Sequence, residues 1–128
     1  MAISIEAQNA VLEAVKQEYL ACVGNHGAFR NHHEAYAVLL EELEEVLDEM
    51  GAFYDSSKFA RKMLWGLIKG DKMSDDDSDS DILVSGLKSL AIIMIQEAVQ
   101  VAAVSQKWLD LIDRERAVNR LINGGEVQ

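Results

Sequence analysis

The stretch that decides the fold is EAYAVLLEELEEVLDE, at residues 34–49. Its apolar residues recur at intervals of three and four positions, which is the spacing of one face of an α-helix. Between residues 31 and 52 the chain has seven carboxylates and no lysine or arginine. Like charges three or four residues apart destabilise a helix by about 0.2–0.5 kcal/mol per pair. This concentration therefore indicates either a solvated acidic face or a binding site for a cation.

Composition favours helices throughout. The 128 residues include 49% hydrophobic residues, few aromatics and no proline, a mixture typical of helical proteins. The sequence predicts a single all-α domain over residues 1–128, built as a four- to five-helix bundle. The expected helices cover residues 4–23, 31–50, 56–69, 82–113 and 114–123, and the last of these is either a separate helix or a kinked continuation of the one before it. Ser4 and Asn31 are the expected N-caps, and Gly24, Gly51 and Gly70 the expected helix ends.

Two segments are expected to lie outside the helices. Residues 71–81 form an acidic, flexible loop, in which Asp79 or Asp81 caps the next helix. A calcium loop is the alternative, but the glycine and glutamate that such a loop needs at positions six and twelve are missing. Residues 124–128 are expected to form a flexible tail after the last helix.

Charge and cysteine content exclude several classes of function. The formal net charge is −10, which argues against binding to nucleic-acid polymers, because these need a basic surface. The single cysteine, Cys22, excludes an internal disulfide. No signal peptide is recognisable, and the most apolar run, residues 90–95, is too short to span a bilayer. The expected location is therefore the cytoplasm, without contact to a membrane.

The segment from residue 82 to 95 is apolar nearly all round. A helix of this kind lies in the middle of a bundle or in an interface between subunits. The sequence therefore predicts a homo-oligomer, either a homodimer or a homotetramer.

Glu97 and Gln100 follow directly on this apolar segment, three residues apart, and so share one side of a helix. If that side faces the acidic helix, four oxygen-bearing side chains converge, namely Glu42, Glu45, Glu97 and Gln100. Such a set suits magnesium, or manganese in its place. The alternative is that Glu97 and Gln100 make buried hydrogen bonds or a salt bridge with Lys88 or Lys107.

Two blocks of the chain resemble a known family. Residues 29–45, FRNHHEAYAVLLEELEE, and residues 97–103, EAVQVAA, are similar to two helices of the MazG-like, all-α nucleoside-triphosphate pyrophosphohydrolases. The family pattern is Glu-x-x-Glu on one helix and Glu-x-x-Asp on another. Glu42 and Glu45 match the first pair and Glu97 opens the second, whereas Gln100 stands where the family has Asp. The two blocks together contain 24 residues, and they are more widely separated than is usual.

The resemblance implies a magnesium-dependent enzyme that cleanses nucleotide pools. It would hydrolyse a nucleoside triphosphate, preferably a deoxynucleotide, to a monophosphate and pyrophosphate. Metal ligands would be Glu42, Glu45, Glu97 and Gln100, with Glu41 or Glu45 orienting or deprotonating the attacking water. Two other hypotheses stay open: a catalytically impaired relative that binds a nucleotide or a protein, and an unrelated helical adaptor whose acidic helix binds a basic partner.

Several further residues have both a functional and a structural interpretation. Positive partners for phosphates are Lys58, Arg61 and Lys62, or Arg114, Arg116 and Arg120; all of them also suit an exposed surface. Trp65 and Trp108 could stack on a base, but their apolar neighbours favour packing. A zinc site is the functional interpretation of the set Cys22, His26, His32 and His33. A helix end followed by a histidine-containing loop explains that set equally well.

Overall fold

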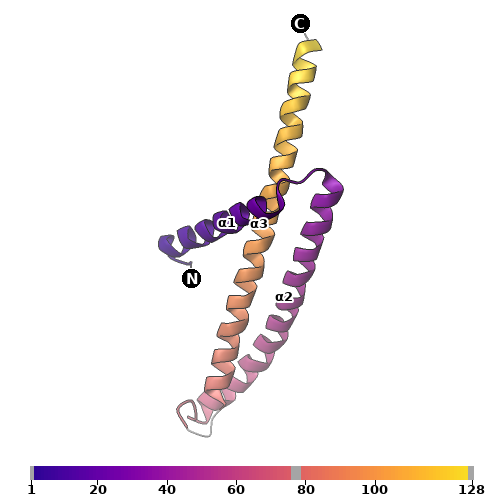
Figure 1. Cartoon of the computed structure of the whole chain (residues 1–128). Helices are drawn as coiled ribbons and strands as arrows, with labels where there is room; N and C mark the ends of the chain where they lie inside the picture. The colour runs from indigo at the N-terminus through magenta and orange to yellow at the C-terminus, as the bar shows by residue number, and fades with distance from the viewer. Residues whose placement is uncertain (1, 76–78, 127–128) are drawn as a thin grey trace. The chain divides into compact units, whose positions relative to one another are not determined.

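The computed structural model describes residues 2–75 and 79–126, and these are all helical or in loops (Figure 1). The prediction of an all-α protein is confirmed. Within the described residues there are three helices, in the order α1 (Ile5–His26), α2 (His32–Lys69) and α3 (Ser80–Glu126). The number differs from the expected four or five because neighbouring helical segments are continuous.

Helix α1 begins where the sequence predicts and ends slightly later. The Ser4 hydroxyl oxygen accepts a hydrogen bond from the amide of Ala7 at 3.1 Å, as expected of an N-cap. The helix runs through Gly24 and ends at His26. Gly27 follows with φ +71° and donates its amide to the carbonyl of Val23. Gly27 is therefore the terminating residue, because its conformation is one that other residues rarely adopt.

Helix α2 joins two segments that the sequence analysis separated at Gly51. Its start agrees with the prediction, since the side-chain oxygen of Asn31 accepts a hydrogen bond from the Glu34 amide at 2.9 Å. The helix continues through Gly51 to Lys69. A glycine inside a helix costs only about 1 kcal/mol, and no proline is present to break the backbone pattern. The predicted stop at Gly70 is confirmed, and Asp71 after it has φ +54°.

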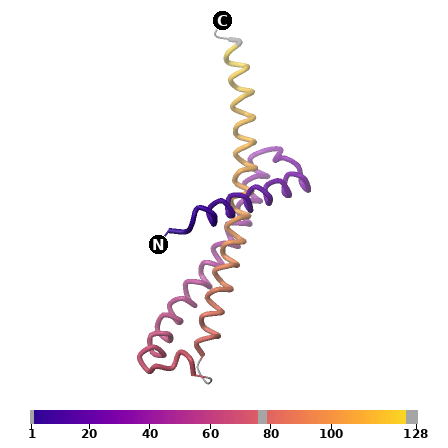
Figure 2. The backbone as a smooth tube through the Cα atoms, turned by 90° about the vertical axis from the view of Figure 1, so that its left-hand side faces the viewer, coloured from indigo at the N-terminus to yellow at the C-terminus, as the bar shows by residue number. Residues whose placement is uncertain are grey.

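Helix α3 is the longest, with 47 residues. Its start is marked by the hydrogen bond from the Leu83 amide to the Asp79 carbonyl at 3.0 Å. The expected division between residues 113 and 114 is absent, and the backbone trace continues as one helix (Figure 2). The helix extends to Glu126, so the start of the expected tail is helical. Residues 76–78 of the expected acidic loop and residues 127–128 lie outside the described part.

The chain divides into two compact units, each of which has its own packing. The first unit comprises Met1–Leu43 and Ala98–Gln128, and the second comprises Glu44–Glu97. In the first unit, Phe29, Ala35, Val104 and Leu111 form a buried core. In the second, the end of α2 and the start of α3 are joined by the loop after Lys69, and Ala60 and Ser80 are buried. The Ser80 hydroxyl donates to the Met73 carbonyl at 2.6 Å.

Large apolar side chains remain exposed along α3. Ile82 is 74% exposed and Leu121 is 79% exposed, and Ile92, Ile93 and Ile95 are exposed as well. By length and composition, the span Ser80–Gly124 of α3 is also apolar enough to cross a membrane, although a single helix of this kind is a weak signal. Large contiguous apolar patches are rare on monomeric soluble proteins.

Candidate functional site

The second unit contains a pair of facing carboxylates. Glu45 lies on α2 and Glu97 on α3, and their oxygen atoms lie within 4.8 Å of each other. The proximity of Glu97 raises the pKa of Glu45 above its ordinary value of 4.5, chiefly through a hydrogen bond between the two side chains, with smaller effects of desolvation and charge repulsion. Two ionised carboxylates have no proton to share. A shared proton or a bound cation would therefore stabilise the pair.

One oxygen of this pair is buried without a partner. Glu97 Oε2 is inaccessible to solvent and accepts no hydrogen bond from any described residue. A buried carboxylate oxygen without a donor is unfavourable. A cation bound at Glu97 would satisfy this oxygen.

The other two predicted ligands lie in the first unit. Glu42 and Gln100 both line a cavity of about 490 Å³ between α1, the start of α2 and the later part of α3. Each unit thus contains two of the four predicted ligands. Glu42 and Glu45 are one helical turn apart on the unbroken helix α2. Glu41 and Glu44 are both exposed.

The cavity of the first unit also contains Lys107, which the sequence analysis considered only as a salt-bridge partner of Glu97 or Gln100. Lys107 is only 6% exposed, and its ammonium lies 4.2 Å from the centre of the Phe29 ring. No salt bridge of Lys107 is found among the described residues. Val104 and Leu111 lie three residues before it and four after it, and both are buried. That apolar spacing is the signal that predicts a buried position for Lys107.

Cys22 lies in the same cavity and is shielded by its neighbours. Its thiol donates a weak hydrogen bond to Glu18 Oε1 at 3.8 Å. Desolvation raises the pKa of Cys22 most strongly, and the charge of Glu18 and its hydrogen bond add to this, whereas Lys107 opposes it. The zinc interpretation is not supported, because no described residues bring Cys22 and the three histidines into one metal-binding group.

We expect Glu18→Gln to make Cys22 react faster with iodoacetamide at pH 7.5. The thiolate is the reacting form, and the change removes the negative charge that disfavours it. We expect the alkylation rate to increase several-fold. Mass spectrometry of samples taken over time measures this rate. Glu13→Gln, five residues earlier on α1, is the matched control and should leave the rate unchanged. Equal rates in all three proteins would contradict the assigned role of Glu18.

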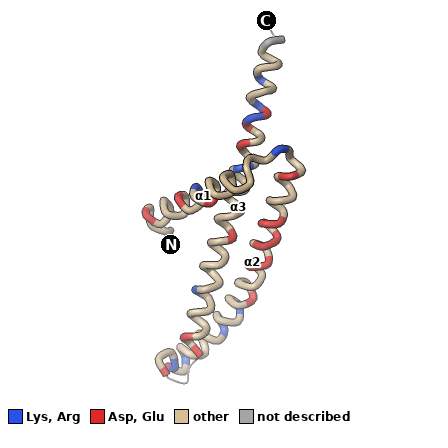
Figure 3. Tube along the Cα trace, in the orientation of Figure 1, with Lys and Arg blue, Asp and Glu red and all other residues tan. Residues whose placement is uncertain are grey.

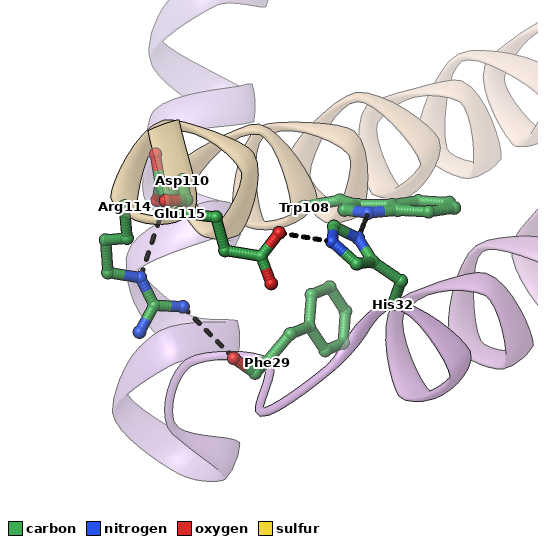
Figure 4. Close-up of polar contacts among 6 residues, drawn as sticks. All are labelled: Phe29, His32, Trp108, Asp110, Arg114 and Glu115. Atoms are coloured by element: carbon green, nitrogen blue, oxygen red, sulfur yellow. Dashed lines mark hydrogen bonds and ion pairs between the residues drawn. The ribbon is translucent and has the colours of Figure 1, made fainter. Parts of the chain in front are cut away.

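A chain of polar contacts connects α2 to α3 within the first unit (Figure 4). The indole N–H of Trp108 donates to His32 Nδ1 at 2.9 Å, and His32 Nε2 lies 2.6 Å from Glu115 Oε2. Because Nδ1 accepts, the neutral ring carries its proton on Nε2 and donates it to Glu115. Arg114 in turn donates to the Phe29 carbonyl at 3.0 Å. These contacts assign His32, Trp108 and Arg114 to structure, since they hold the loop before α2 against α3.

The predicted phosphate-binding residues lie in the second unit. Lys58, Arg61 and Lys62 line a groove together with Trp65, which is 61% exposed. Figure 3 shows that the acidic residues of α2 precede its basic ones. Lys58 follows Glu45 by thirteen positions on the same helix, which corresponds to about 20 Å along the helix axis. The structure therefore separates this basic group from the carboxylate pair.

No protein-family model, curated protein or solved structure matches the chain. The resemblance to the MazG-like enzymes therefore stays a prediction that rests on the residues of the two blocks.

Proposed function

We propose that the protein is a magnesium-dependent nucleotide pyrophosphohydrolase of the MazG-like, all-α type. The observation that supports this best is the facing pair of Glu45 and Glu97, in which the pKa of Glu45 is raised and an oxygen of Glu97 is buried without a hydrogen-bond partner. Both features fit a divalent cation, which prefers carboxylate oxygens. The proposed substrate is a nucleoside triphosphate, preferably deoxy, and the products are a monophosphate and pyrophosphate.

Each residue has a defined role in this proposal. Glu42, Glu45, Glu97 and Gln100 would hold magnesium, or manganese in its place. When bound, the ion supplies positive charge that offsets the charge developing on the phosphates. Glu41, which is exposed, or Glu45 orients the attacking water and accepts its proton. The water oxygen bonds to the α-phosphorus, and the bond to the oxygen bridging the α- and β-phosphates breaks.

Gln100 supports a second candidate function. Its amide is neutral and coordinates only through the carbonyl oxygen, so the proposed site has one negative charge fewer than the family pattern. A protein that has kept the helical scaffold but lost efficient metal binding would bind a nucleotide or a protein without turnover. The two candidates differ in one measurable property, which is turnover.

A homodimer or homotetramer belongs to the same proposal. The exposed isoleucines of α3 would be covered by a second copy, which would supply the further helices of a four- to five-helix bundle. The proposed location is the cytoplasm. Sedimentation of the purified protein without detergent tests the oligomeric state and the absence of membrane insertion. We expect a soluble dimer or tetramer, because a membrane-inserted helix would require detergent for solubility.

Turnover and its dependence on position 100 test the proposed function. We expect the protein to release pyrophosphate from at least one deoxynucleoside triphosphate in the presence of magnesium. Gln100→Asp should tighten magnesium binding, by about tenfold, without lowering activity, because a carboxylate replaces a neutral ligand. Gln96→Asp, one turn earlier and exposed, is the control and should have no such effect. No turnover by either protein at saturating magnesium would refute the enzyme and leave the non-catalytic candidate.

A further inference from the structure

A groove in the second unit combines basic and apolar side chains of a single helix. Its volume is about 690 Å³, and all the residues that line it belong to the end of α2. Trp65 is 61% exposed and Ile68 is 55% exposed. Exposed apolar side chains bordered by charges are typical of a surface that binds a protein or a membrane. The groove is lined by Lys58, Arg61, Lys62, Leu64, Trp65 and Ile68.

The preceding part of α2 in the same unit carries the opposite charge. Residues 44–55 contain five carboxylates and no lysine or arginine, whereas residues 58–69 contain four basic residues and no carboxylate. Figure 3 shows this change of sign along the helix. Apolar side chains accompany the acidic ones, since Leu47, Met50 and Tyr54 are exposed. They recur at intervals of three and four residues and therefore form one stripe on the helix surface.

This stripe is separate from the side of α2 that is shielded within the chain. Val46, Phe53 and Ala60 are half-buried or buried, and they recur at intervals of seven residues. Leu47 and Tyr54 each follow one of them by one position, about 100° further around the helix, and both are more than 60% exposed. A helix with a second apolar stripe of this spacing can pack against another helix along its length.

A single chain cannot bring the acidic and basic parts of α2 together. The helix is unbroken, and Asp48 and Lys62 are fourteen positions apart, which corresponds to about 20 Å along the helix axis. A second copy that runs antiparallel places the acidic part of each α2 against the basic part of the other. Such a contact is self-complementary and closes with two copies. A parallel pair would place like charges opposite each other, which is unfavourable.

We propose that the exposed face of α2 over residues 44–69 binds the same face of a second copy, with the two helices antiparallel. The groove at the end of each α2 would hold the acidic, apolar stripe of the other copy. The inference rests on the proposed function only for the existence of a homo-oligomer, and it adds a surface to the one proposed on α3. Two such surfaces on different helices would assemble two dimers into a tetramer.

Two charge-reversed proteins test this inference by sedimentation velocity. Glu44→Lys with Asp48→Lys makes both parts of α2 carry exposed positive charge, and Lys58→Glu with Lys62→Glu makes both carry negative charge. Each double variant alone should associate at this face more weakly than the wild type, by about tenfold or more, because like charges then face each other. An equimolar mixture of the two should associate as the wild type does, because opposite charges face each other again.

Rescue in the mixture separates loss of the contact from loss of folding. Glu6→Lys with Glu13→Lys makes the same change of charge at exposed positions of α1 and is the matched control, which should associate as the wild type does. Equal association of the wild type and both reversed variants would overturn the inference, as would a mixture that associates no better than its components. A monomeric wild type that binds vesicles containing phosphatidylserine would also overturn it. Absence of pyrophosphate release by proteins that associate as expected would instead refute only the proposed hydrolase.

Discussion

Glu45→Gln is expected to raise the melting temperature of the metal-free protein at pH 7 and to abolish the further rise that magnesium gives the wild type. At pH 7 the carboxylates of Glu45 and Glu97 repel each other, and the neutral amide removes this repulsion while donating a hydrogen bond to Glu97. Since Glu45 is exposed, the gain without metal should be small, about 1–3 °C.

The pH dependence of this gain has a defined sign. The folded protein raises the pKa of Glu45, so the folded state binds a proton more tightly than the unfolded state. Stability therefore falls as the pH rises from the ordinary pKa of 4.5 through the raised value, and the full repulsion persists above it. The difference between Glu45→Gln and the wild type should be largest at neutral pH and should vanish below about pH 4. Melting curves from pH 3.5 to 8 would measure it.

With magnesium bound, the wild type is expected to have a higher melting temperature than Glu45→Gln, the reverse of the order without metal. A ligand at one hundred times its dissociation constant stabilises the folded state by about 2.7 kcal/mol, which raises the melting temperature of the wild type by on the order of 10 °C. Glu45→Gln should show no such rise and no pyrophosphate release. Glu44→Gln changes the neighbouring exposed carboxylate and should respond as the wild type does. Identical metal responses in all three proteins would show that the acidic helix is an ordinary solvated surface.

The sequence predicts the start of each of the first two helices because caps act locally. Ser4 and Asn31 need only a hydrogen bond to an amide three residues away, so their role is visible in the sequence. Gly51 shows the limit of the same reasoning. Its conformational cost of about 1 kcal/mol is too small to end a helix by itself, and α2 continues through it to Lys69.

The sequence predicts residues of the candidate site only where a charged residue occurs at an unusual position in the helical pattern. Glu45 and Glu97 stand out because each breaks an expected pattern, one by repulsion on its helix and the other by its apolar surroundings. Lys107 shares the helical spacing of the buried Val104 and Leu111, but lysines are usually exposed, so its residue type argues against the burial that its position predicts. Phe29 is a single aromatic residue in a loop, where no periodicity exists to predict burial. Both positions depend on how α1, α2 and α3 pack in the first unit.

Phe29→Ala is expected to be the most destabilising single change in the first unit. Phe29 is 2% exposed and is the largest fully buried side chain among the described residues. It fills the core beside Ala35, Val104 and Leu111. Truncation of a buried phenylalanine costs about 3–5 kcal/mol, a large part of the 5–15 kcal/mol by which most proteins are stable. Urea unfolding followed by circular dichroism measures the loss.

The surroundings of Phe29 should place the loss of stability in Phe29→Ala toward the upper end of the range of about 3–5 kcal/mol. The alanine variant leaves the Lys107 ammonium without its aromatic partner, while the backbone contact from Arg114 remains. A double-mutant cycle with Lys107→Met isolates the ring–ammonium contact, and we expect a coupling of about 0.5–2 kcal/mol. Phe59→Ala is the matched control. The Phe59 side chain lies in the second unit and is 59% exposed. Its truncation should therefore lower the free energy of unfolding by less than about 1 kcal/mol. Equal losses of stability in Phe29→Ala and Phe59→Ala would mean that the Phe29 side chain does not stabilise the first unit or the cavity that it lines.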